Sequence, residues 1–261
     1  MSLHLLLVIY SAALGLMVGS YLNVVVYRLP RGISTVLPRS RCPGCGNPIR
    51  ARDNLPVLSF LLLRGRCRNC GARIGWSYPL VEAATALLFV ACLLRFGPTP
   101  GALAAALFCC LMLVLALIDA RHLLLPDRIT LPGIALGLAI QPWLPWDGLR
   151  SAAVGALLGA GVLLAMWAGW YLLRREEGMG LGDVKMLALI GAFLGWRGVL
   201  VALFFAALTG AATGLALMWT GGTGMQDGLK TKLPFGSFLA LGGLVALFAG
   251  HEIAGWYARM L

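Results

Sequence analysis

Charged side chains are scarce in this sequence: only 12% of its 261 residues are Asp, Glu, Lys or Arg, whereas 60% are hydrophobic. Such a composition excludes an ordinary water-soluble domain and is typical of a polytopic membrane protein. Acids are scarcer than bases, 10 against 21, which gives a formal charge of +11. In a membrane protein a basic excess more often sets topology than binds nucleic acid, so we expect membrane lipids and no nucleic acid as partners.

Eight apolar runs are candidate membrane spans. The first has no Lys or Arg ahead of it, so it lacks the basic start of a signal peptide and is expected to be retained as a helix. The run at 181–194 is short, and it would have to tilt, thin the bilayer or line a wet cavity. The predicted fold is an all-α polytopic membrane protein with about eight transmembrane helices, at 3–27, 78–94, 101–118, 129–143, 152–173, 181–194, 199–219 and 234–256.

The stretch 28–77 has a different character, because ten arginines stand there against one acid, Asp53. By the positive-inside rule we expect this loop in the cytoplasm and both chain termini in the periplasm. The remaining charges agree with this topology. Connections predicted to be cytoplasmic contain Arg121, Arg128, Arg174, Arg175, Lys230 and Lys232, whereas predicted outer ends contain only Arg95, Arg150, Arg197 and Arg259.

The same loop contains two C-x-x-C pairs, Cys42 with Cys45 and Cys67 with Cys70. They are separated by 21 residues, just outside the range of about 15 to 20 usual for paired zinc knuckles. Four thiolates suit tetrahedral zinc, and a glycine after each pair allows a tight turn. We expect the neighbouring arginines to lower the pKa values of the thiols and so favour metal binding. The prediction is a structural zinc site.

Other roles for these cysteines are less favoured. Disulfides do not suit a reducing cytoplasm, and a redox-active C-x-x-C would need a thioredoxin-like βαβ context that the loop lacks. A closed sphere of four cysteines leaves no open position for catalysis, so zinc here would be structural. The three histidines are too scattered for an H-E-x-x-H zinc protease motif.

Two acids stand at the ends of apolar runs. Asp119 ends the third predicted span and Asp183 begins the sixth, within GMGLGD, and the predicted topology places both at the cytoplasmic side. Facing each other in a poorly hydrated cleft, two such carboxyls would share one proton, because two ionised carboxylates repel. One would then activate a water while the other polarises the scissile carbonyl, which is the chemistry of an aspartic protease.

A structural role explains the same acids about as well. Asp183 could cap its helix or pair with Lys185, and Asp119 could pair with Arg121 or His122. For Asp127 we favour an N-cap of the helix starting near Ile129 over a catalytic role. Glu82, just inside the second span, is a candidate either for supporting substrate binding or for pairing with Arg73.

Several segments resemble one family in the same order along nearly the whole chain. LIDARHLLLPDRITLP and GMGLGDVKMLALIGAFLG are similar to the two signature segments of the type IV prepilin peptidases, membrane aspartic proteases of the GxGD class. GSYLNVVVYRLP, the cysteine loop and KLPFGSFLALG also match. The resemblance implies that Asp119 and Asp183 are the catalytic pair, and it divides the chain into a first helix (1–27), a zinc-binding loop domain (28–77) and a peptidase membrane domain (78–261).

Family members with this loop are bifunctional leader peptidase/N-methyltransferases, so the resemblance also implies S-adenosylmethionine as methyl donor. Nothing in the loop matches a Rossmann-type glycine-rich turn, and the residues that bind this cofactor are left unassigned. The implied substrates are prepilins and type II secretion pseudopilins, whose basic leader stays on the cytoplasmic side of the bacterial inner membrane. A loop with ten arginines should repel that leader, so Glu176 and Glu177 are better candidates to meet it.

The sequence departs from the family pattern at two places, with Asn54 and Leu55 before Pro56 where an isoleucine is common, and with Ser237 where a proline is common. Both departures leave the acids and cysteines in place. The alternative functions are a non-enzymatic membrane assembly protein that docks partners through a zinc loop, and a membrane thiol oxidoreductase. An assembly protein would bind a prepilin without shortening it.

Overall fold

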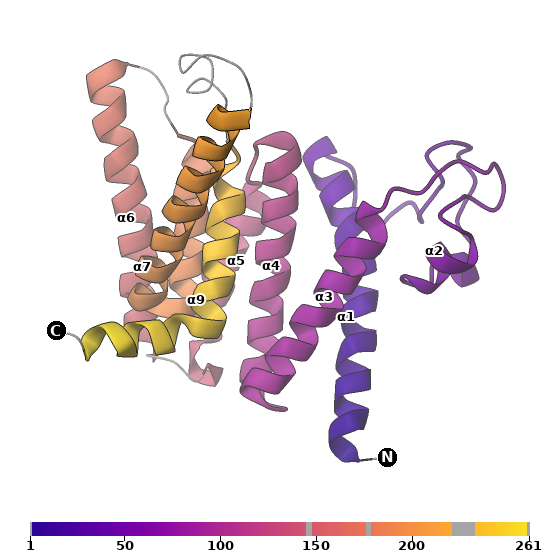
Figure 1. Ribbon diagram of the computed structural model, residues 1–261, viewed down its shortest axis with the longest axis horizontal. Coiled ribbons are helices and arrows are strands. Elements are labelled where there is room, and N and C mark those ends of the chain that lie inside the picture. The colour runs from indigo at the N-terminus through magenta and orange to yellow at the C-terminus, as the bar shows by residue number, and fades with distance from the viewer. Residues whose placement is uncertain (1, 145–147, 176–178, 221–232, 260–261) are drawn as a thin grey trace. The chain divides into compact units, whose positions relative to one another are not determined.

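The computed structural model describes residues 2–144, 148–175, 179–220 and 233–259 (Figure 1). Within these residues the regular structure is helical, with two isolated β-bridges and no strand, which confirms the predicted all-α fold. The α-helices are α1 (Leu3–Arg28), α2 (Leu58–Leu62), α3 (Ser77–Phe96), α4 (Pro100–His122), α5 (Asp127–Ala139), α6 (Gly148–Arg174), α7 (Leu181–Thr220) and α9 (Phe235–Ala258). Short 3-10 helices are η1 (Leu29–Arg31), η2 (Ala51–Asp53) and η3 (Gln141–Trp143).

Every predicted span falls on a helix, although two predicted spans share one element. The runs at 181–194 and 199–219 both lie in α7, which is interrupted at Gly195, where φ is 69° and ψ is −176°. In the described part of the chain, five helices are long and apolar enough to cross a membrane: α1, α3, α4, α6 and α7. Helix α9 contains a shorter apolar stretch, Phe235–Gly250. Helix α5 has only 13 residues, or about 20 Å, and is too short to cross a core of about 30 Å unaided.

The chain forms two compact units, Met1–Cys110 and Leu111–Leu261. In the first unit, α1 packs along α3. A Cβ at Gly19 of α1 would lie 2.7 Å from the Cα of Glu82 in α3, so only glycine allows this approach. Asn23 Nδ2 donates to the carbonyl of Tyr78 at 3.1 Å, an interhelical bond of the kind expected for a polar residue in a span. The cysteine loop joins these two helices and contains α2 (Figure 1).

In the second unit, α7 packs against α5, α6 and α9. Its first half is buried, with Met186, Leu187, Leu189 and Ile190 inaccessible to solvent. Gln141, just after α5, donates from Nε2 to the carbonyl of Ala192 at 2.7 Å and so satisfies a polar group inside the unit. Asp183 therefore begins the most enclosed segment of this unit.

Candidate active site and metal centre

The two acids singled out from the sequence lie in the same unit. Asp119 is near the end of α4 and Asp183 is the third residue of α7, and their exposed fractions are 5% and 8%. The fold thus places in one compact unit two carboxyls that are 64 positions apart in sequence. Among the described residues no ion pair joins Asp183 to Lys185, or Asp119 to Arg121 or His122.

Leu125 links the helix ends around these acids. A Cβ at Gly182, next to Asp183, would lie 2.8 Å from Leu125 Cβ, and a Cβ at Gly236 would lie 3.0 Å from Leu125 Cδ1 and 2.9 Å from Asp119 Oδ2. Three segments therefore converge on the acids: the turn after α4, the start of α7 and the start of α9. The glycines keep this space open, because any side chain at either position would enter it.

Helix α9 orients Asp119 through hydrogen bonds. The backbone N–H of Ser237 donates to Asp119 Oδ2 at 2.9 Å, and the Ser237 hydroxyl lies 3.4 Å from the same oxygen and 3.0 Å from the carbonyl oxygen of Ala116. A second backbone bond to this carboxyl comes from Gly236. Ser237, which the sequence marks only as a departure from the family pattern, thus contacts one of the candidate catalytic residues.

Asp127 does not serve as the predicted N-cap. Helix α5 begins at Asp127 itself, after Pro126, and no side chain caps it. Instead the Asp127 carboxylate pairs with Lys185 Nζ at 2.6 Å. This ion pair joins α5 to α7, and it also occupies the lysine that was considered as a partner for Asp183.

The cysteine loop brings its four predicted ligands together. The Sγ atoms of Cys42, Cys45, Cys67 and Cys70 all lie within 4.8 Å of one another, and those of Cys42 and Cys70 are 3.8 Å apart. The segments 42–46 and 67–71 form two knuckles with the same backbone conformation. In one, the N–H of Gly46 donates to the carbonyl of Cys42, and in the other, the N–H of Gly71 donates to the carbonyl of Cys67; both glycines have a φ of 70°. All four thiols are unbridged.

The arrangement fits a tetrahedral metal ion. With Zn–S bonds of about 2.3 Å, sulfur atoms at the corners of a tetrahedron lie about 3.8 Å apart, and the thiols need only small shifts to reach that geometry. The loop is further held by Arg68, whose guanidinium binds both oxygens of Asp53 at 2.7 to 3.0 Å. This hydrogen bond lowers the pKa of Asp53 below its ordinary value.

The thiol pKa values differ from the sequence-based expectation. Backbone N–H groups of Cys70 and Asn69, rather than arginines, lower the pKa of Cys67 to about 7. For Cys70, the N–H of Ala72 lowers the pKa, but desolvation and the thiols of Cys45, Cys67 and Cys42 outweigh it and raise the value to about 11. The prediction that the arginines lower the thiol pKa values was therefore wrong for this pair: the two knuckle thiols respond to their own backbone and to each other.

Glu82 lies at the base of the cysteine loop and is 7% exposed. Its Oε2 accepts a hydrogen bond of 2.7 Å from the backbone N–H of Val57, and its carboxyl also bonds to Ser20. Arg73, the alternative partner suggested by the sequence, forms no ion pair with it in the described structure.

The fold and the two clusters define a class: a helical multi-pass membrane protein with a four-cysteine cluster that could hold a metal ion in its first unit and two buried acids in its second. Residues 13–96 match the bacterial peptidase A24 N-terminal domain and residues 106–215 match the type IV leader peptidase family. The chain belongs to the type IV leader peptidase family.

Relatives of similar length support this assignment. A prepilin leader peptidase/N-methyltransferase of Burkholderia pseudomallei (strain 1026b) is 41% identical, over 92% of this chain and 85% of the relative. Proteins of the same name from Aeromonas hydrophila and Pseudomonas aeruginosa are 40% and 38% identical, over 93% and 97% of this chain and 90% and 93% of theirs. No solved structure matches the chain.

Proposed function

We propose that this protein is a bifunctional prepilin peptidase: it cleaves the leader of type IV prepilins and type II secretion pseudopilins and then N-methylates the new amino terminus. The observation that carries the proposal is the pair of buried acids, Asp119 and Asp183, at helix ends that converge around Leu125. Membership of the type IV leader peptidase family and the names of the relatives support it.

In this mechanism the two acids divide the work. We assign the shared proton to Asp183 and the ionised form to Asp119, because the backbone N–H and the hydroxyl of Ser237 both donate to Asp119 Oδ2 and such donors favour an ionised carboxylate. Asp119 then takes a proton from water as the water oxygen attacks the scissile carbonyl carbon, while Asp183 donates a hydrogen bond to the carbonyl oxygen. When the C–N bond breaks, the proton held by Asp119 passes to the leaving amine.

The proposed placement follows the charge pattern. The cysteine loop and the acid pair are assigned to the cytoplasmic side of the bacterial inner membrane and the termini to the periplasm, because the loop contains ten arginines and one acid. A basic leader would remain inside while the mature helix lies in the bilayer. Glu176 and Glu177, the candidates to meet that leader, lie outside the described residues.

We assign zinc to Cys42, Cys45, Cys67 and Cys70, in a structural role, because four thiolates fill its coordination sphere. S-adenosylmethionine would supply the methyl group for the second activity. In this proposal residues 78–261 form the peptidase domain, while residues 28–77 form the loop domain that supports methylation.

Incubation of the purified full chain with a synthetic prepilin peptide tests the peptidase. The expected product is a peptide shortened by its leader. Asp119→Asn and Asp183→Asn should each reduce cleavage by at least about 10³-fold, because the first removes the group that takes a proton from water and the second removes the acid that polarises the scissile carbonyl, while zinc content stays at the wild-type level. Binding of the peptide without a shorter product would identify an assembly protein, and residual processing by either variant would remove that residue from the catalytic pair.

A further inference from the structure

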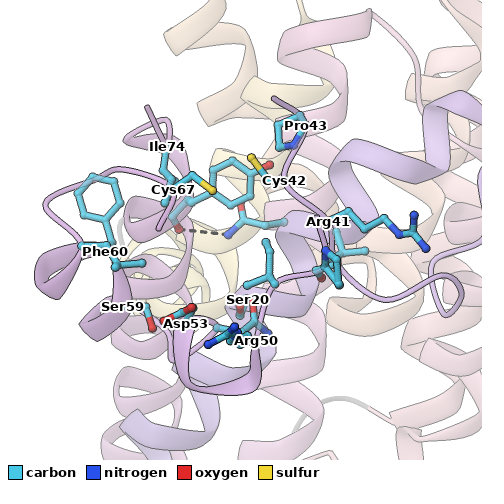
Figure 2. A pocket seen from close by; sticks show the side chains of 18 of the residues that line it. Ser20, Arg41, Cys42, Pro43, Arg50, Asp53, Ser59, Phe60, Cys67 and Ile74 are labelled. Carbon is cyan, nitrogen blue, oxygen red and sulfur yellow. Dashed lines mark hydrogen bonds between the residues drawn. The ribbon is translucent and has the colours of Figure 1, made fainter. Parts of the chain in front are cut away.

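A cavity of about 510 Å³ lies in the first unit, where the last turns of α1 and the first turn of α3 meet the cysteine loop. Figure 2 shows side chains of α1 and of the cysteine loop around this cavity, including Ser20 of α1 and Arg50, Asp53 and Phe60 of the loop. Its volume is in the range of sites for small molecules. Peptide cleavage by Asp119 and Asp183 makes no use of this cavity.

One part of the cavity wall is negative and buried. Glu82 lines it from α3 with an exposed fraction of 7%, beside the buried amide of Asn23 from α1. The N–H that binds Glu82 belongs to Val57, whose φ of 59° is a strained conformation for a β-branched residue. The carboxyl of Glu82 is therefore bound by a residue whose backbone conformation is itself strained.

The rest of the wall is rich in cations and aromatic rings. Of six lining arginines, Arg28 donates to the carbonyl of Ser34, and Arg68 is paired with Asp53. Within the described structure no ion pair engages the other four, Arg39, Arg41, Arg50 and Arg73. Guanidinium groups bind carboxylates in a bidentate manner. Three aromatic residues also line the cavity, Tyr27, Phe60 and Tyr78; Arg31 lies over the Tyr27 ring and Phe60 packs against Trp76, so Tyr78 is the ring on which a planar base could stack.

We propose that this cavity is the binding site of S-adenosylmethionine, with Glu82 as counter-charge of its sulfonium and the arginines as partners of its carboxylate. The proposal rests on the methyl-transfer half of the proposed function. A buried acid disfavours a nucleoside phosphate, whose charges are all negative, whereas S-adenosylmethionine has both a carboxylate and a cationic sulfonium. The cavity supplies both signs of charge.

The metal centre adjoins this site. Cys42 and Cys67, one from each knuckle, line the same cavity. A metal ion that fixes the four thiols would thus also fix one wall of the cavity, which gives the cysteine loop a direct structural link to methyl-donor binding.

Isothermal titration of the full chain in detergent micelles tests the proposal with two ligands, S-adenosylmethionine and the neutral product S-adenosylhomocysteine. Glu82→Gln should weaken binding of the sulfonium ligand about tenfold and change binding of the thioether less than about threefold, because only the former loses a charge partner. Glu252→Gln, which neutralises an exposed acid of α9, is the matched control and should bind both ligands as the wild type does.

Photolabelling of the wild-type chain with 8-azido-S-adenosylmethionine provides a second measurement that does not depend on how the variant folds. Labelled peptides should fall within residues 20–28, 39–60 or 67–82. Three results would overturn the site while leaving methyl transfer intact. The Glu82→Gln variant could lose affinity for both ligands equally, it could lose affinity for neither, or the labelled peptides could all fall within residues 111–261. If the wild-type chain binds neither ligand, the methyl-transfer half of the proposed function fails together with the site, and peptide cleavage is judged by its own assay.

Discussion

Substitution of Gly236 by alanine is the sharpest test of how Asp119 is positioned. A Cβ at this residue would lie 2.9 Å from Asp119 Oδ2 and 3.1 Å from its Cγ, whereas ordinary contacts begin near 3.4 Å. The carboxyl must therefore retreat by about half an ångström, away from the N–H of Ser237 that binds it. Because a displacement of about 1 Å can cost about 100-fold in rate, we expect kcat for prepilin cleavage to fall about tenfold.

The assay follows initial rates of peptide cleavage across substrate concentrations, so that kcat and KM are separated. KM should change little, since the clash is with the acid and not with the substrate. The free energy of unfolding should fall by about 1–3 kcal/mol, the usual range for an overpacked site. Methylation of a pre-cleaved peptide should continue at the wild-type rate, because Gly236 belongs to the second unit and the proposed methyl-donor site to the first.

Gly161→Ala is the matched control. Gly161 lies within α6, and a Cβ there would meet nothing within 4 Å. This variant should cleave at the wild-type rate. A Gly236→Ala protein that keeps its wild-type kcat would refute the argument, since Asp119 could then move without consequence and its geometry would not be part of the catalysis.

Three further outcomes are expected. Cys45→Ser should lose zinc, as measured by metal analysis, and reduce methylation more than cleavage; an equal collapse of both activities would mean that the loop supports the whole fold. Because zinc displaces the thiol protons, and the pKa values of Cys67 and Cys70 are about 7 and about 11, zinc affinity should fall as the pH is lowered and fall more steeply below about 7, so a zinc dissociation constant that is the same on both sides of pH 7 would contradict this. Asp127→Asn removes a partly exposed ion pair with Lys185 and should change cleavage less than about threefold, so a 100-fold loss would give Asp127 a catalytic role.

The helices were predictable because each depends on a local property of the chain. Six of the eight apolar runs match helical segments to within about four residues, and the other two, 181–194 and 199–219, both lie in α7. The gap predicted between the runs at 181–194 and 199–219 corresponds to a kink at Gly195, whose non-helical backbone separates two helical segments within α7. The short α5 was also less predictable, because a distant contact holds the residues just beyond its end: Gln141, in η3, is fixed by the carbonyl of Ala192.

Parts of the acid site depend on contacts between residues far apart in sequence, which no local pattern contains. Asp119 and Asp183 stood out because an acid is costly within an apolar segment. Ser237 is 118 positions from Asp119, and nothing around it indicates that its N–H would meet that carboxyl. The predicted N-cap at Asp127 failed for the same reason: Lys185, 58 positions away, offers the carboxylate an ion pair instead. The cysteine cluster, in contrast, was predictable from a local pattern, because the C-x-x-C spacing sets the geometry of each knuckle, and the four thiols lie together as predicted.

Buried acids give a reason to associate two activities with the two units. The described residues contain three acids that are less than 9% exposed, Glu82, Asp119 and Asp183, and all three lie in helices apolar enough to cross a membrane. Each acid lies within about two turns of an end of its helix, where it can reach a water-accessible site, so a functional role is the default explanation for all three. Two of them lie in the second unit, as a reaction that moves one proton between two carboxyls requires. The third is single, held by Val57 and Ser20, and is the acidic part of a cavity that is otherwise lined by arginines, which suits a ligand with charges of both signs and not hydrolysis.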